Sequence, residues 1–221
     1  MSVSRELFPL VLVDIALFCV DQRGLRVLVV RRADEPEKGR WALPGGILKP
    51  DIDVSLQDAA LRVLREKVGV EIPHLEEVCT FSGPDRDARG WSISVLFYAL
   101  LPRNEIEAVG KKKVEALDWS DAARPAQKLA FDHAAQLRRA LATLRDKVER
   151  HALPLHLMPE KFTLTDLQRT CEAILGRELD KSVFRRRLKG SEDLLELDEF
   201  ERGAQRPAQL WKARVGFQFA V

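Results

Sequence analysis

The sequence is poor in the features that mark several classes of protein. Its three cysteines, Cys19, Cys79 and Cys171, lie far apart without any CxxC spacing, so neither a disulfide framework nor a zinc site is indicated. The apolar stretch at residues 7–20 is interrupted by Asp14 and is too short to span a bilayer. No basic segment followed by a long apolar run opens the chain. We therefore expect a cytoplasmic protein with reduced thiols and no membrane partner.

The sequence also lacks a large net charge, internal repeats and low-complexity tracts. Lysine and arginine number 36 and aspartate and glutamate 34, which gives a formal net charge of +2. The overall charge therefore does not indicate a polyanionic partner, and any nucleic-acid surface must be local. With 221 residues, of which 46% are hydrophobic and 32% charged, the chain can form one large globular domain or two modest ones.

The first 150 residues alternate strand and turn patterns around two helices. Strands are expected at residues 10–20, 25–32, 74–83, 91–101 and 114–121. A helix is expected from about Ser55 to Val68, with Gly69 as its C-terminal cap. A longer helix is expected from about Pro125 to Glu149, where apolar residues recur at helical spacing. This pattern predicts an α/β (α+β) fold.

The last 70 residues have a different pattern, with two short helices in succession. Residues 162–176 form the first, with Thr163 as its N-cap and Asp166 as the capping-box partner. After a short turn, Asp180 caps a second helix at residues 181–190. Two helices separated by about four residues form a helix-turn-helix, whose second helix enters the major groove of DNA.

The second of these helices carries positive charge only. Phe184 and Leu188 define its buried side, and two strands at 194–200 and 208–215 follow, joined by a basic loop at 201–207 that is typical of a wing. The predicted DNA contacts are Lys181, Ser182, Arg185, Arg186, Arg187 and Lys189 of the helix, with Ser182, Arg185 and Arg186 on the groove side, and Arg202, Gln205 and Arg206 of the wing. A solvated charged face on a winged helix that contacts proteins is the alternative interpretation.

Residues 41–70 have the layout of a pyrophosphate-cleaving site: a PGG turn, an acidic loop, and a helix that ends in REKVG. The stretch resembles the Nudix box, G-x5-E-x7-R-E-U-x-E-E-x-G-U, in which U is aliphatic. The positions that match are Arg62, Leu64, Glu66, Gly69 and Val70. Three glutamate positions instead hold Val54, Val63 and Lys67, and the loop after Gly46 is two residues longer than the pattern.

These departures affect the metal chemistry that the resemblance implies. In Nudix enzymes the glutamates hold Mg²⁺, which requires several oxygen ligands in near-octahedral geometry. Val63 removes one oxygen donor, and Lys67 places a cation where the metal would sit. Asp58 is expected to pair with Arg62 at i, i+4 spacing, while Asp51 and Asp53 lie on a loop that we expect to be flexible. We therefore predict no metal site and no enzyme, although residual hydrolysis stays open.

The whole chain resembles the bacterial Nudix-related transcriptional regulators of NAD metabolism. The stretches that carry this resemblance are RADEPEKGRWALPGG (32–46), PDRDARG (84–90), LAFDHAAQLRRALATLRDKVE (129–149), MPEKFTLTDLQRTCEAILGRELDKSVFRRRL (158–188) and RPAQLW (206–211). The resemblance implies a Nudix-like α/β/α sandwich that senses an effector, at residues 1–151 with the linker helix, and a winged helix-turn-helix that binds DNA, at 152–221. It implies a homodimeric repressor of NAD-related or sugar genes that leaves a palindromic operator when it binds ADP-ribose or a related nucleotide.

Several residues are expected to form the effector pocket. They are Arg31, Arg32, Trp41, Gly45, Gly46, Arg62, Glu66, Arg86 and Arg89. The arginines suit a diphosphate, although Arg31, Arg32, Arg86 and Arg89 can equally form surface ion pairs. Trp41 can stack on a base, but core packing is favoured, and His133 is expected to be a packing residue. Two further functions stay open: a hydrolase of ADP-ribose-type substrates with an accessory domain, and a protein adaptor.

Overall fold

A computed structural model describes residues 8–72, 74–102, 105, 116–150, 152–201, 207–217 and 219 of the chain. The predicted wing residues Arg202, Gln205 and Arg206 lie outside this set. Among the described residues, no helix has both the length and the apolar character needed to cross a bilayer.

A mixed sheet of seven strands forms the centre of the larger part of the molecule. Its strands are β1 (Leu10–Asp21), β2 (Gly24–Arg31), β3 (Trp41–Ala42), β4 (Gly45–Ile47), β5 (His74–Gly83), β6 (Ser92–Leu100) and β7 (Leu117–Asp121). The path runs β3-β2-β1-β6-β5, with β4 paired to β1 and β7 to β2. Only β1 and β6 run parallel within it. Both of these strands are buried along most of their length because helices cover both faces.

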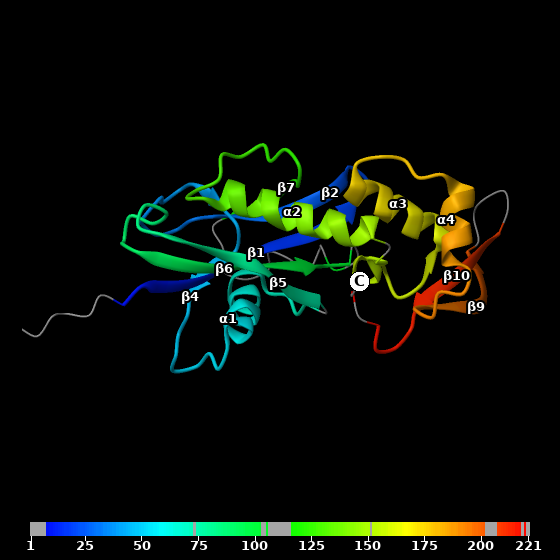
Figure 1. The fold of residues 1–221 in the computed structure, drawn as a ribbon, viewed down its shortest axis with the longest axis horizontal. Helices are drawn as coiled ribbons and strands as arrows, with labels where there is room; N and C mark the ends of the chain where they lie inside the picture. Colours follow the sequence, from blue (N-terminus) through cyan, green and yellow to red (C-terminus); the bar gives the residue numbers. More distant parts are fainter. Residues whose placement is uncertain are drawn as a thin grey trace, which may run out of the picture.

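The two faces of the sheet are covered by different helices (Figure 1). α1 (Leu56–Val63) and the π-helical turn η1 (Leu64–Val68) pack on the face that includes Val13 and Ile15. α2 (His133–Glu149) packs on the opposite face, against Ala16 and Phe18. The expected cap at Gly69 is confirmed, since this residue has a left-handed φ of 81°. The predicted α/β/α sandwich is therefore present.

The start of α2 differs from the prediction. The apolar spacing indicated a helix from about Pro125, but the helix begins at His133. Leu129 is buried as expected, yet it forms an isolated bridge with Trp41, and the Ala130 N–H donates to the Trp41 carbonyl at 2.7 Å. Phe131 then takes a left-handed φ of 51°. Tertiary pairing with β3 therefore outweighs the local helical pattern.

The C-terminal part is a winged helix. It contains β8 (Phe162–Thr163), α3 (Leu164–Leu175), α4 (Lys181–Leu188), β9 (Leu194–Glu201) and β10 (Ala208–Ala213), with the three strands in the order β8-β10-β9. The predicted capping box of Thr163 and Asp166 is present. The Asp180 carboxylate accepts a hydrogen bond from the Val183 N–H at 2.7 Å, which confirms the second cap.

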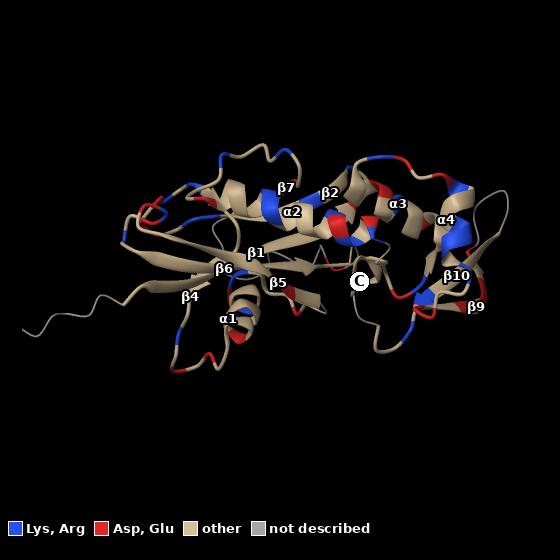
Figure 2. Ribbon diagram, viewed as in Figure 1, with Lys and Arg blue, Asp and Glu red and all other residues tan. Residues whose placement is uncertain are grey.

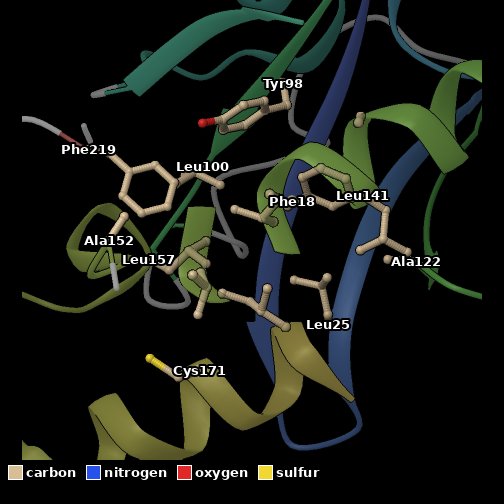
Figure 3. Close-up of a cluster of buried hydrophobic side chains, with 14 of the residues drawn as sticks. Phe18, Leu25, Tyr98, Leu100, Ala122, Leu141, Ala152, Leu157, Cys171 and Phe219 are labelled. Carbon is tan, nitrogen blue, oxygen red and sulfur yellow. The ribbon is translucent and has the colours of Figure 1, made fainter. Parts of the chain in front are cut away.

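The two parts share one continuous hydrophobic cluster. Leu144 and Val148 of α2 belong to the same cluster as Leu167, Cys171 and Ile174 of α3. Side chains of β1, β2, β6, α2, α3 and the short helical turn η3 (Leu155–Leu157) converge there (Figure 3). α2 therefore contacts the sheet along one stretch and the winged helix along another.

Candidate functional site

A cavity of about 490 Å³ opens beside the sheet, next to the PGG turn. Strands β1 and β2, the loop after β2, the turn η1, residues 86–89 and the start of α2 all contribute to its wall. The predicted ligand residues Arg31, Arg32, Gly45, Gly46, Arg62, Glu66, Arg86 and Arg89 line it. Trp41 does not line this cavity; it is half-buried and packs against the hydrophobic cluster, in line with the favoured core interpretation.

The two glycines of the PGG turn are required by close approach of other groups. A Cβ atom on Gly45 would lie 2.1 Å from Oδ1 of Asp14. A Cβ atom on Gly46 would lie 2.7 Å from Cγ2 of Val63. Glycine at both positions therefore lets the turn lie directly on strand β1 and on helix α1.

Arg62 is held by a buried carboxylate from the acidic loop. Its guanidinium donates from two nitrogens to Asp53, both at 2.7 Å, and to the Ile47 carbonyl at 3.1 Å, and it lies 3.3 Å from Glu66. The hydrogen bond from Arg62 lowers the pKa of Asp53 to about 2. The expected pairing with Asp58 is wrong, because Asp58 instead accepts from the Ser55 hydroxyl at the N-cap of α1.

Arg86 lies in a second buried network, at the start of α2. It donates to both carboxylate oxygens of Asp132 at 3.0 Å and to the Ser92 hydroxyl at 3.2 Å. Gln136 donates to Asp132 at 2.8 Å and to Asp14 at 3.0 Å. This network ties the first turn of α2 to strands β1 and β6.

His133 completes that network on the cavity side. Its Nδ1 accepts a hydrogen bond from the Leu43 N–H at 2.9 Å, while its Nε2 lies 3.5 Å from Asp14. Burial lowers the pKa of His133 because it disfavours the charged imidazolium. The expected packing role holds, and the side chain lines the cavity as well.

The other cavity arginines differ in their partners. Arg89 pairs with Asp87 at 2.7 Å, and this hydrogen bond lowers the pKa of Asp87. Arg31 and Arg32 instead donate to backbone carbonyls, of Gly39 at 3.1 Å and of Pro36 at 2.9 Å. The Arg32 guanidinium also lies 4.7 Å from the centre of the Phe131 ring, in a cation–π contact. Some arginines of the cavity are therefore held by carboxylates, and others by backbone carbonyls.

The residues at the glutamate positions of the Nudix box do not fit a Mg²⁺ ion. The Val54 side chain is 96% exposed and Val63 is buried against Gly46. The Lys67 ammonium donates to the Gly45 carbonyl. Glu66 is shared between Arg62 and Lys49, the latter at 3.9 Å. In the described part of the chain, no group of three or more His, Cys, Asp or Glu side chains is placed to hold a metal ion. This donor set lacks the hard oxygens that Mg²⁺ requires.

The second helix of the winged helix, α4, is rich in basic residues (Figure 2). Lys181, Ser182, Arg186 and Lys189 are exposed. Arg185 is only half-exposed and donates to the Thr165 hydroxyl at 3.1 Å. Arg187 is half-buried, with one guanidinium nitrogen out of contact with solvent, and burial lowers its pKa. Of the residues predicted for the groove side, Ser182 and Arg186 are exposed, whereas Arg185 is held to Thr165.

Comparison with known proteins identifies the two parts. Residues 11–144 match the NUDIX domain, and residues 154–213 match the NrtR DNA-binding winged helix domain. The Acinetobacter baylyi protein described as ADPR responsive transcriptional repressor NtrR is 41% identical over 205 residues, 92% of this chain and 82% of the relative. The chain belongs to the NrtR family. The resemblance noted in the sequence is thereby confirmed.

Solved structures of an NrtR protein agree with this assignment. Shewanella oneidensis NrtR complexed with a 27mer DNA matches with a TM-score of 0.79 and 33% identity, over 92% of this chain and 93% of that chain. The NUDIX domain of the same protein, complexed with ADP ribose, matches with a TM-score of 0.55 and 35% identity. This second match covers 62% of the present chain and 89% of the other.

Sequence reasoning missed several residues of the cavity. Asp14 and Phe131 line it, and Gln136 and Asp132 hold the network behind it. One signal was available, since a carboxylate within an apolar strand such as β1 is rare unless it has partners. Phe131 and Asp132 gave no such signal, because their positions depend on the irregular segment before α2.

Proposed function

We propose that this NrtR-family protein is a transcriptional repressor that leaves its operator when ADP-ribose or a related nucleotide occupies the cavity. One observation carries the proposal: a cavity rich in cations and an outward-facing basic helix belong to one continuous fold, joined by α2. The names of its relatives support it, because one is an ADPR responsive repressor and another was crystallised both with DNA and, as its NUDIX domain, with ADP ribose.

The DNA side would use α4 in the major groove. Lys181, Ser182, Arg186 and Lys189 are exposed there and can reach phosphates or base edges. The wing residues Arg202, Gln205 and Arg206 would reach the adjacent backbone or minor groove. A homodimer would place two copies of α4 in successive major grooves about 34 Å apart, which requires a palindromic operator.

The effector side would use the arginines of the cavity to bind a diphosphate. A charged ligand that entered here would interact with Arg31 and Arg32 directly and would compete with Asp87 and Asp132 for Arg89 and Arg86. Such competition would disturb the network that holds the first turn of α2. Genes of NAD metabolism are the proposed targets, on the resemblance alone.

The helix α2 would carry the response to the DNA side. Its first turn carries His133 at the cavity and Gln136 in the network behind it, and its last turns pack against α3. In addition, Arg145 donates to the Ile174 carbonyl at 2.8 Å. A shift of α2 would therefore move α3 and α4 together and change the spacing of the two recognition helices in a dimer.

The same cavity would bind its ligand without cleaving it. Metal-assisted hydrolysis needs an ion that polarises the phosphate and activates water, and the donor set around Glu66 does not fit one. Phosphate release from ADP-ribose with Mg²⁺ or Mn²⁺ is the direct test. Sustained turnover would show that the chain is a hydrolase.

A gel-shift experiment with the protein's own promoter region tests the repressor proposal. We expect retardation of a palindromic fragment at physiological salt and its release by ADP-ribose. Competition with unrelated DNA of equal length distinguishes specific from non-specific binding. Absence of any specific complex, or a complex that ADP-ribose leaves unchanged, would contradict the proposal.

A further inference from the structure

Lys67 lies in the cavity at a position where the Nudix box has a glutamate. It is one helical turn after Val63, whose side chain packs against Gly46, so both residues face the PGG turn. The Lys67 ammonium reaches the Gly45 carbonyl and donates to it. That carbonyl uses one of the three N–H donors of the ammonium, which leaves the other two for a ligand.

The cations of the cavity fall into two groups by their partners. Arg62, Arg86, Arg89 and Lys49 each have a carboxylate partner. Within the described part of the chain, Arg31, Arg32 and Lys67 have no such ion pair, although all three line the cavity.

The cations around the cavity repel one another. Burial and the nearby charge of Arg32 lower the pKa of Lys67, against the smaller effects of Asp14, Asp34 and Glu66. Burial and the charge of Arg89 similarly lower the pKa of Arg32. Positive charges held together, three of them without an ion pair among the described residues, favour an anion in the space between them.

We propose that Lys67 replaces the metal ion of the Nudix site: its ammonium, together with Arg32, neutralises the diphosphate of the effector, so that binding needs no Mg²⁺. This inference rests on the proposed function for the identity of the ligand. A lysine binds phosphate as a point charge. Unlike a metal ion, it supplies no bound water of lowered pKa, so the ligand is held without an activated nucleophile.

Calorimetric titration of the full chain tests this inference with two probes, ADP-ribose and inorganic pyrophosphate. Both are titrated in metal-free buffer, and ADP-ribose is titrated again with Mg²⁺. We expect ADP-ribose to bind equally well in the two buffers. Lys67→Met keeps most of the side-chain stem and should weaken both probes by about tenfold to a hundredfold, the range for one charged hydrogen bond.

Arg65→Met is the matched control, because Arg65 is exposed on the same turn of helix, outside the cavity wall, and loses the same charge. It should bind both probes as the unaltered chain does. Lys67→Arg keeps the charge and should retain most of the affinity. Equal thermal melting of the variants excludes unfolding as the cause of a loss.

The outcomes separate this inference from the proposed function. The inference is overturned if binding needs Mg²⁺, or if the Lys67→Met variant binds ADP-ribose as tightly as the unaltered chain. Either result leaves the proposal of ADP-ribose as effector unaffected. If pyrophosphate binds without metal and depends on Lys67, but ADP-ribose does not bind, the inference is supported. That result contradicts the proposal that ADP-ribose is the effector. If neither probe binds, both are wrong.

Discussion

The cavity and the recognition helix α4 both present lysines and arginines, but they hold them in different ways. The cations of the cavity come from β2, η1 and loops far apart in the sequence, and Arg62, Arg86 and Arg89 are fixed by carboxylates. The cations of α4 lie within nine residues, and most are exposed. Ion pairs therefore fix part of the cavity in advance, whereas most cations of α4 lie at the surface.

This difference has consequences for the response to salt. Exposed charges are screened by ions, and binding to DNA releases condensed counterions, so affinity through α4 should fall steeply with salt. A diphosphate releases far fewer counterions than DNA does, so the affinity of the cavity should depend on salt more weakly. Measuring how the affinity for DNA and the affinity for the cavity ligand each change with salt, in the same protein, tests this difference directly.

The largest effect is expected when the connection between the two regions is broken. Leu144 is fully buried in the cluster that α2 shares with α3, and Leu144→Ala should reduce the free energy of unfolding by about 2–5 kcal/mol. Because the cluster is continuous, the tryptophans of the larger part, Trp41, Trp91 and Trp119, should report the same transition as Trp211 of β10. Urea unfolding followed by fluorescence measures both quantities.

Ala142→Lys on the exposed side of α2 is the control and should stay close to the unaltered chain. Two separate transitions, or a loss below about 1 kcal/mol for Leu144→Ala, would show that the two regions fold independently of this contact.

The next effect compares two neighbouring arginines of α4. Arg186 is exposed, and Arg186→Ala should weaken operator binding by about 1–3 kcal/mol if it reads a base. Arg187 is half-buried, with one guanidinium nitrogen out of contact with solvent, so Arg187→Ala removes the same charge but should affect DNA affinity much less. Fluorescence anisotropy with labelled operator DNA gives both affinities. Equal losses for the two variants would indicate that only the net charge of α4 matters.

The sequence predicted the winged helix more accurately than the cavity. Capping residues, apolar spacing and a run of basic residues are all local, so Thr163, Asp180 and Phe184 could be assigned from a few neighbours. Even here, the spacing placed Arg185 on the groove side beside Arg186, although Arg185 is only half-exposed. The direction of each side chain depends on α3, which packs against α4.

The cavity depended on contacts that the sequence does not encode locally. The predicted arginines do surround one cavity, because the PGG turn and the helix of the Nudix box were correctly located. The partner of Arg62 was wrong, because Asp53 folds inward from a loop that was expected to be flexible, instead of Asp58 at helical spacing. The network of Asp14 and Gln136 joins residues 122 positions apart, which no short pattern reveals.

A smaller effect on stability is expected when the pH is lowered, at the boundary between the large sheet and the winged helix. His74 of β5 stacks on His156 of η3 at 4.7 Å, with Glu76 3.5 Å from His74 and Lys147 close by. Burial lowers the pKa of His74, and it lowers the pKa of His156 to about 4. Between pH 4 and about 6.5 the unfolded chain therefore binds more protons than the folded chain, so stability falls as the pH falls.

Between pH 7 and pH 5, His156 should contribute a loss of up to about 2 kcal/mol. His156→Phe retains an aromatic ring beside Phe217, which lies 5.1 Å away, and should show a smaller decrease over the same range. Urea unfolding at a series of pH values tests this difference. Parallel curves for the two proteins would mean that other groups account for the acid sensitivity.

The smallest effect on stability is expected from the ion pair that spans the boundary at the surface. Arg177, after α3, pairs with Glu149 at the end of α2 at 2.6 Å, and both side chains are more than half exposed. Glu149→Gln should therefore change the free energy of unfolding by only about 0–1 kcal/mol.

The position of this ion pair still matters for the link between α2 and α3, because the pair and the hydrogen bond from Arg145 to Ile174 both join these helices. If α2 transmits the effector signal as one rigid element, Glu149→Gln should leave release of DNA by ADP-ribose unchanged, while Arg145→Met should weaken it. A gel-shift titration of both variants distinguishes a signal carried by the packed helix from one carried by its surface charges.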